Sequence, residues 1–340
     1  MSLTRLTTGK YITGSTYTVV RPVLPPMRVG TSIRPFSSSS LKHIRLFLPS
    51  TETENIRKTP PAWPHPIYTD EQLKQIGISH RETRNFGDKV ALSAIRTLRW
   101  GFDLVSGYRH DDAVAAHAKD PAMAKQKYSM TEEKYLIRNI FLESIAGVPG
   151  MVGGMLRHLR SLRRMRRDNG WIETLLEESY NERMHLLTFL QMAEPGFFLH
   201  LCVLGAQGVF FNAFLMAYLV NPRICHRFVG YLEEEAIITY TREISDIDAG
   251  KLPKWEKMQA PNIAVQYWNM PEGYRSVKDL LLYIRADEAK HREVNHTFAN
   301  LNWKEDPNPY VSQYKDEGKP RPSKAMDGKR QNGWERQDVI

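Results

Sequence analysis

The sequence predicts an all-α fold in which four long helices form a bundle and additional helices lie beside it. Apolar residues recur at helical spacing over about 81–302, which we take as one helical domain. No strand-like alternation and no internal repeat competes with this interpretation. Two Glu-x-x-His pairs, Glu182/His185 and Glu288/His291, fall on separate helical stretches, as expected for residues that face the interior of a bundle.

The first part of the chain reads as an arm followed by two helices. Residues 46–80 are rich in proline and polar residues, which indicates an extended arm. A first helix is expected over 81–108, followed by a polar connector over 106–128. A second helix with good N-terminal capping residues should span about 129–167 and bend near Pro149.

Four further helices and a C-terminal segment complete the prediction. The third helix should run from about 168 to 195, and the fourth, over 196–220, is the most apolar segment of the chain. The fifth should span about 222–247, and a sixth about 275–300, after a loop that contains proline and tryptophan. The remaining 303–340 is polar and rich in glycine, proline and lysine, which predicts a disordered tail.

The positive charge of the chain is concentrated at its N-terminus. The formal net charge is +9, yet seven basic residues and no acidic residue lie within 1–51, which leaves the rest at 9 − 7 = +2. An acid-free segment with arginine and many Ser and Thr residues is typical of an organellar transit peptide, which we place at 1–45 with cleavage near 37–45. A merely disordered basic tail is the alternative. No apolar block of a secretory signal is present.

Two segments favour contact with a membrane. Pro195–Val220 has 26 residues and no Asp, Glu, Lys or Arg, although His200, Gln207 and Asn212 interrupt it. The helix over 81–108 is amphipathic, so the two could hold the protein in one leaflet without crossing it. Whether the segment spans the membrane is left open, and a buried central helix of a soluble bundle is the alternative.

Six arginines crowd the end of the second predicted helix: Arg157, Arg160, Arg163, Arg164, Arg166 and Arg167. They favour contact with anionic lipid headgroups, and a solvated helix end is the alternative. No aromatic interleaving or reader motif accompanies them, so a nucleic acid is not expected as a partner.

Position on the helix distinguishes metal ligands from chance Glu-x-x-His pairs. On the sixth helix, Glu288 and His291 continue the apolar seam of Ile284, whereas the pair Glu293/His296 lies on a different line and is placed outside the ligand set. The same test selects further residues on apolar seams: Glu182 and His185 on the third helix, Glu143 on the second, and Glu233 on the fifth, but neither Glu234 nor Glu235.

Burying four glutamates on apolar seams is energetically costly unless they bind cations, which indicates that they are metal ligands. The alternative is that the four acids are buried by coincidence and bind no metal. Four carboxylates and two imidazoles form the ligand set of a ferritin-like bundle with a carboxylate-bridged di-iron or di-manganese centre. Asp287, next to Glu288, is placed to accept a proton from a ligand histidine and so hold its ring. Asn181, next to Glu182, is expected to hold a ligand in a similar way. Tyr240 lies two turns after Glu233, where a phenol can supply an electron and a proton, or can simply be a core residue.

Four long motifs resemble those of the mitochondrial alternative oxidases. They are Leu142-Glu-Ser-Ile-Ala-Gly-Val-Pro-Gly-Met151, Asn181-Glu-Arg-Met-His-Leu186, Leu232-Glu-Glu-Glu-Ala236 and Arg285-Ala-Asp-Glu-Ala-Lys-His-Arg-Glu-Val-Asn-His296. The resemblance covers about 85–300. It implies a cyanide-insensitive, non-proton-pumping oxidase that oxidises ubiquinol and reduces dioxygen to water at two non-haem iron ions. It also implies a monotopic location on the matrix face of the mitochondrial inner membrane, with inner-membrane lipids as partners.

The family's functional residues carry over to this chain at matching positions. Its iron ligands fall on the six residues that the seam test selects, and its essential tyrosine on Tyr240. Its quinone-site residues fall on Arg138, Leu142, Glu235, Ala236 and Thr239.

No cysteine precedes Cys202, unlike plant members, so the sequence resembles fungal members more closely and a disulfide-linked dimer is not expected; a homodimer of another kind is left open. A membrane di-iron hydroxylase that acts on a quinone or lipid is the main alternative function. A ferritin-like iron-binding protein and a membrane structural or transport protein are the other two.

Overall fold

The computed structural model describes residues 61–108, 130–315 and 318–340, and helices joined by loops make up these ranges. Within these ranges the only β-structure is an isolated bridge between Gln259 and Ser276. The predicted transit peptide, the first part of the arm and nearly all of the polar connector lie outside the described residues. The described residues belong to one of the two compact units of the chain, Ile44–Ile340. The all-helical prediction is confirmed for this part of the chain.

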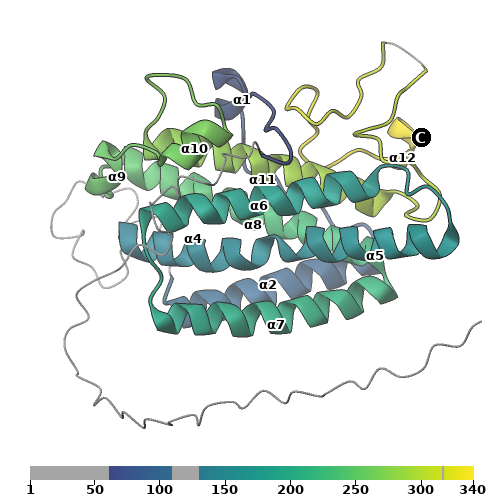
Figure 1. The fold of residues 1–340 in the computed structure, drawn as a ribbon, viewed down its shortest axis with the longest axis horizontal. Coiled ribbons are helices and arrows are strands. Elements are labelled where there is room, and N and C mark those ends of the chain that lie inside the picture. Colours follow the sequence, from purple (N-terminus) through teal and green to yellow (C-terminus); the bar gives the residue numbers. More distant parts are fainter. Residues whose placement is uncertain (1–60, 109–129, 316–317) are drawn as a thin grey trace, which may run out of the picture. The chain divides into compact units, whose positions relative to one another are not determined.

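Four helices form the bundle that holds the predicted ligands (Figure 1). They are α4 (Glu132–Ala146), α6 (Trp171–Met192), α8 (Pro222–Asp248) and α11 (Val277–Asn300). α11 packs along α8, and α4 packs against α6. α11 lies at the centre of the bundle, because nearly all of its side chains are buried, including the charged ones. Acidic and basic side chains of α11 must therefore find partners inside the protein.

The predicted second helix is two helices in the structure. α4 ends at Ala146, and α5 (Val148–Arg164) begins after Gly147. Pro149 lies in the first turn of α5, where its missing N–H removes no helical hydrogen bond. Gly150 lets α5 approach α6 closely, since a Cβ there would lie 2.4 Å from the carbonyl oxygen of Leu175. The expected bend is therefore present as a short break.

α2 (Phe86–Ser106) and α7 (Phe197–Val220) expose apolar faces, and both lie at the lower edge of the view in Figure 1. Only 11% of the most apolar window of α7 is buried. Large apolar side chains of both helices are exposed, among them Trp100, Leu104, Leu204 and Val209. The alternative of a buried central helix is therefore wrong for α7. By length and composition, α7 and the combined segment Glu132–Arg164 could each cross a membrane, which is weak evidence for membrane association.

The arginine cluster is divided between the interior and the surface. Arg157 is buried, its Nε donates to Asp168 at 2.7 Å, and its guanidinium lies over the Trp171 ring. Arg160 contacts the ring of Trp303. Arg163, Arg164, Arg166 and Arg167 are exposed. The prediction of six lipid-facing arginines is corrected for Arg157, because an apolar neighbourhood and a carboxylate hold it inside.

Four short helices were not predicted: α1 (Asp70–Lys74), α9 (Pro253–Lys257), α10 (Asn262–Tyr267) and α12 (Arg336–Val339). Each has at most six residues, which is too short to show a helical period. α1 interrupts the predicted extended arm and begins at Thr69, whose side chain accepts a hydrogen bond from the backbone of Gln72 in a capping box.

The segment 303–340 is folded over its described residues, so the prediction of a disordered tail is corrected. Tyr310, Trp334 and Val339 pack with Phe298 of α11 and with Trp171 of α6 in one apolar cluster. Trp334 is 1% exposed, and its Nε1 donates to Glu293 at 3.0 Å. Composition predicted disorder because the segment is polar and its buried apolar residues are few and widely spaced. These residues are stabilised by packing against α6 and α11, which composition does not show.

Candidate metal centre

The six side chains predicted as metal ligands meet inside the bundle, and each is at most 7% exposed. They come from all four bundle helices: Glu143 from α4, Glu182 and His185 from α6, Glu233 from α8, and Glu288 and His291 from α11. Helical spacing explains the pairs, because residues three apart on one helix point to the same side. The cluster therefore combines four carboxylates and two imidazoles out of contact with bulk water.

The six residues form two overlapping groups that could each hold a metal ion, with ligand atoms within 4.8 Å of one another. One group is Glu143, Glu182, His185 and Glu288, and the other is Glu182, Glu233, Glu288 and His291. Glu182 and Glu288 belong to both groups. The arrangement has the form of two adjacent metal positions that share two carboxylates.

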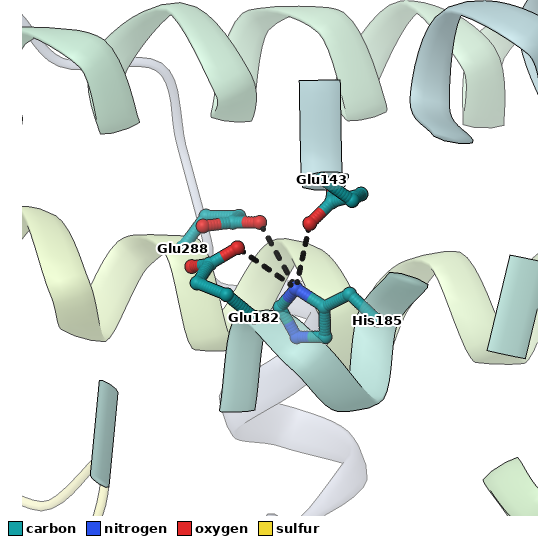
Figure 2. A group of neighbouring side chains, drawn as sticks. All are labelled: Glu143, Glu182, His185 and Glu288. Atoms are coloured by element: carbon teal, nitrogen blue, oxygen red, sulfur yellow. Dashed lines mark ion pairs between the residues drawn. The ribbon is translucent and has the colours of Figure 1, made fainter. Parts of the chain in front are cut away.

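The distances assign the shared carboxylates to a bridging position. His185 Nδ1 lies 3.6 Å from Glu182 Oε2 and 3.3 Å from Glu288 Oε1 (Figure 2). The other oxygen of each carboxylate faces His291, whose Nδ1 lies 2.7 Å from Glu182 Oε1 and 3.3 Å from Glu288 Oε2. Glu143 Oε2 completes the first group at 3.4 Å from His185 Nδ1. Each shared carboxylate thus presents one oxygen to each imidazole.

Several buried ligand atoms make no hydrogen bond: Glu143 Oε2, both carboxylate oxygens of Glu182, and His185 Nδ1. Glu182 Oε1 is close to His291 Nδ1 but lacks the geometry of a hydrogen bond. Burying such polar atoms unpaired is unfavourable, and natural proteins rarely do so. These atoms belong to one cluster and all can offer lone pairs. Cations at this position would satisfy them together, so the residues fit a two-metal centre.

Asp287 sets the orientation of His185. Asp287 Oδ2 lies 3.1 Å from His185 Nε2. Because a carboxylate can only accept, the proton of the imidazole is on Nε2, and the Nδ1 lone pair is free to face Glu143, Glu182 and Glu288. This is the usual way in which a second residue fixes the tautomer and the ring position of a metal-binding histidine.

Asp287 is held by five donors in all. His65 Nε2 at 2.7 Å and Tyr68 Oη at 2.8 Å bind one oxygen. Asn181 Nδ2 at 3.0 Å and Trp268 Nε1 at 2.9 Å bind the other oxygen together with His185. Burial alone would raise the pKa of Asp287, but the electrostatic attraction of the His65 ring and the hydrogen bonds from His185 and His65 outweigh it and hold the pKa well below its usual range.

Two carboxylates of the cluster, those of Glu143 and Glu233, bind a proton more tightly than an exposed glutamate does. Burial raises the pKa of Glu143 to about 8. Burial, followed by the charge of Glu288, raises the pKa of Glu233 well above its usual range. Neighbouring carboxylates in a dry site cannot all be charged, and metal ions would take the place of these protons.

Tyr240 lies at the edge of the cluster, as predicted from its spacing after Glu233. Its side chain is 3% exposed, its hydroxyl donates a hydrogen bond to Glu143 Oε1, and its ring stacks on Phe189 with centroids 6.4 Å apart. Burial and the charge of Glu143 raise the pKa of Tyr240 well above its usual range, so the phenol keeps its proton. The structure thus connects a phenol O–H directly to a predicted metal ligand.

The five residues predicted for the quinone site lie on α4 and α8, apart from the two metal-binding groups: Arg138, Leu142, Glu235, Ala236 and Thr239. Arg138 is 3% exposed and lies over the Tyr108 ring at 4.3 Å. Its Nη2 donates to Asp103 Oδ1 at 2.7 Å. Arg99 joins the α8 residues, since its Nη1 donates to Glu235 Oε2 at 3.0 Å and to Thr239 Oγ1 at 3.3 Å.

Several of these partners were missed by sequence reasoning. His65, Tyr68 and Trp268 support Asp287, and Arg99 and Asp103 link α2 to α4 and α8. His65 and Tyr68 precede Asp287 by more than 200 residues, so no local periodicity could connect them. The Arg99/Asp103 pair does carry a signal, because oppositely charged residues four apart on a helix commonly pair.

The third Glu-x-x-His pair lies outside both metal-binding groups, as predicted. Glu293 accepts from Tyr310 Oη at 3.1 Å and from Trp334 Nε1 at 3.0 Å. His296 Nε2 lies 2.9 Å from Glu234 Oε1. Glu234 and Glu235 also lie outside the groups, and Glu233 is the one of the three neighbouring glutamates that joins them.

The fold and the site define a helical bundle with a buried carboxylate–histidine centre of the di-iron type. The alternative oxidase family model matches residues 68–300. The chain is 62% identical over 307 residues to the mitochondrial alternative oxidase of Venturia inaequalis. This match covers 90% of this chain and 85% of that protein. It is 62% identical over 304 residues to the mitochondrial alternative oxidase of Aspergillus niger, covering 89% of this chain and 85% of that protein.

A third relative, the mitochondrial alternative oxidase of Emericella nidulans, is 58% identical over 313 residues, covering 91% of this chain and 86% of that protein. The chain belongs to the alternative oxidase family, and its relatives support an oxidase enzyme. The resemblance to fungal members that its motifs predict is confirmed.

Proposed function

We propose that this protein oxidises ubiquinol and reduces dioxygen to water at a di-iron centre, without pumping protons, and so bypasses the cytochrome pathway. The observation that carries the proposal is the sharing of Glu182 and Glu288 between two adjacent metal-binding groups. Oxygen-rich ligand sets with one imidazole for each metal suit iron. Membership of the alternative oxidase family supports the same chemistry.

The ligands divide between the two positions. Glu143 and His185 would hold one iron, Glu233 and His291 the other, and Glu182 and Glu288 would bridge both. When bound, the iron pair would supply one-electron steps between quinol and dioxygen. Two ubiquinol molecules each lose two electrons and two protons, and one dioxygen molecule takes up all four of each to give two molecules of water.

The quinol would bind between α4 and α8. The Arg138 guanidinium is oriented by Asp103 and can donate to a quinol oxygen, while Thr239 offers a hydroxyl from the other helix. Leu142 and Ala236 would provide apolar contact for the ring. Glu235 lies at the same place and would take part in binding the head group.

Tyr240 would connect the quinol site to the metal centre. It follows Thr239 in sequence, and its hydroxyl donates to Glu143. A proton on Tyr240 Oη is therefore one hydrogen bond from a proposed iron ligand, and an electron can leave the same phenol with it. Asp287 and Asn181 would act as positioning residues that keep His185 in place during turnover.

The protein would work on the matrix face of the mitochondrial inner membrane as a monotopic protein. The exposed apolar faces of α2 and α7 support insertion into one leaflet, and the exposed arginines that follow Arg160 support contact with anionic headgroups. The basic N-terminal segment supports mitochondrial import. The names of the relatives support the same compartment.

The test is a quinol oxidase assay on the membrane-bound protein with iron measured in the same preparations. Glu182→Ala should lose iron and activity together, because it removes a bridging ligand. Tyr240→Phe should keep its iron and lose activity by about a hundredfold or more, as expected for the loss of a proton-transferring group.

Three outcomes would contradict parts of this proposal. Full iron and full activity in Glu182→Ala would show that the centre is misassigned. Normal turnover in Tyr240→Phe would remove the role of the phenol and leave the metal assignment standing. A hydroxylated quinone or lipid as the product of oxygen uptake would replace the oxidase by the di-iron hydroxylase.

A further inference from the structure

A cavity of about 70 Å³ reaches the metal centre on the side of the N-terminal arm. Its lining includes Asp287 and the proposed ligand His291, which are 2% and 7% exposed, and also Trp63 and Lys324, which are nearer the surface. This volume holds several water molecules. The five quinone-site residues do not line it, so the cavity is a second approach to the centre.

The buried part of the cavity carries acceptors without partners. Asn181 donates through its amide to Asp287 and Tyr267, and its Oδ1 has no hydrogen-bond partner. His65 donates from Nε2 to Asp287, which leaves the Nδ1 lone pair, also without a partner. The buried carboxylate of Glu178 also lines the cavity, but its oxygens already accept hydrogen bonds from Asn295 Nδ2. These oxygen and imidazole lone pairs stand among mostly apolar and aromatic walls, where they can hold a partly hydrated cation. The buried Lys290 also lines the cavity, and its ammonium group is paired with Glu293.

Lys324 lies at the outer end and is paired with acids of α6. Its Nζ lies 2.7 Å from Glu173 Oε1 and 2.8 Å from Glu177 Oε2, and about a third of its side chain, 36%, is exposed. Exposed ion pairs are weak and exchange readily. Glu177 and Lys324 both line the cavity, so a cation that arrives at Glu177 would compete directly with the ammonium group.

We propose that this cavity is the path by which ferrous iron enters the metal centre, with Lys324 as a displaceable cation at its mouth. The inference rests on the proposed di-iron function. Asn181 and His65 would offer transient ligands along the path, and His291 is the first permanent ligand that it reaches. Trp63, His65 and Lys324 all lie outside the 68–300 match to the family, so segments flanking the family region build much of this entrance.

The experiment follows the loading of iron into the full chain in detergent after its metal has been removed by a chelator. Ferrous iron is added without oxygen, samples are quenched with excess chelator, and bound iron per chain is measured against time. Lys324→Gln should load about threefold faster or more at low salt, and Glu177→Gln slower by a similar factor, because charge at a narrow mouth steers cations. High salt should reduce both differences.

Two further variants separate charge from access. Trp63→Ala widens the mouth and should load faster at low and at high salt. Lys278→Gln is the matched control, because Lys278 pairs with Asp248 at an exposed site and does not line the cavity. Lys278→Gln should load at the wild-type rate, and all variants should reach the same final iron content.

The outcomes distinguish this inference from the proposed function. Wild-type loading rates in Lys324→Gln, Glu177→Gln and Trp63→Ala would overturn the entry path while leaving the di-iron centre intact. Equal acceleration in Lys278→Gln would also overturn it, since the effect would then reflect net charge alone. Failure of the wild-type chain to take up iron would contradict the di-iron function itself.

Discussion

The ring of His185 is fixed from both sides, by carboxylates that face its Nδ1 and by Asp287 at its Nε2. At the scale of residues, the sequence predicted which side chains form the cluster but not all of the side chains that hold them in place. Seam alignment selected the six clustered residues, and Asp287 was selected because it precedes Glu288 in the sequence. Seam alignment could not select His65 or Trp268, because their contact with Asp287 depends on how the arm and a loop pack against α11.

Asp287→Asn is expected to weaken metal binding while leaving the fold intact. The amide keeps the shape of the carboxylate but cannot accept from all five donors, so His185 loses its fixed tautomer. The affinity for iron should fall by about tenfold to a hundredfold, as measured by competition with a chelator. Asp279→Asn, at the N-terminal cap of α11, is the control and should leave iron affinity unchanged. Equal affinity in both variants would contradict the positioning role of Asp287.

At the scale of elements, the long helices were predictable because each repeats an apolar period over several turns. The predicted fourth and fifth helices match α7 and α8 within one residue at each end. The sequence predicted a bend near Pro149, and the structure has a helix break at Gly147, two residues earlier. The helices α1, α9, α10 and α12 are too short to show a periodic pattern. Folding of the C-terminal segment depends on Tyr310 and Trp334, single anchors that composition cannot reveal.

Close packing of α5 on α6 leads to a prediction at Gly150. A methyl group there would lie 2.4 Å from a backbone oxygen of α6, so Gly150→Ala should force the helices apart and destabilise the protein by about 1–3 kcal/mol. Denaturant unfolding measures this change. Gly205→Ala in α7, where a Cβ meets nothing within 4 Å, is the matched control and should be neutral or slightly stabilising. Similar unfolding midpoints for the two variants would refute the packing argument.

The C-terminal segment yields a second prediction for an element. Trp334→Ala should cost about 3–5 kcal/mol, because it empties a buried site and removes a donor to Glu293. Trp334→Phe keeps most of the apolar contact and should cost less. Thermal unfolding of both variants and the wild type tests this predicted order of stabilities. A Trp334→Ala protein that is as stable as the wild type would mean that this segment adds no stability.

The whole molecule combines a buried redox site with an exposed apolar edge. We expect α7 to hold the protein on the bilayer. Each of Leu204→Glu and Val209→Glu should remove about 1.5–3 kcal/mol of apolar burial in lipid, so the double variant should partition onto liposomes more weakly by about a hundredfold to ten-thousandfold. Flotation with liposomes measures the change. Ile78→Glu, an exposed apolar position in the arm, is the control, and an equal loss there would argue against α7 as the attachment face.

The hydrogen bonds from the arm to Asp287 have a consequence for anyone who would build a smaller version of this protein. The four ligand-bearing helices resemble a self-sufficient scaffold, yet His65 and Tyr68 reach Asp287 from a segment that precedes all of them. A shortened design that starts at α2 would retain all six clustered residues and lose two of the five donors that hold Asp287. Its minimal boundary therefore lies before His65, and the arm is as much a part of the metal-binding architecture as the bundle.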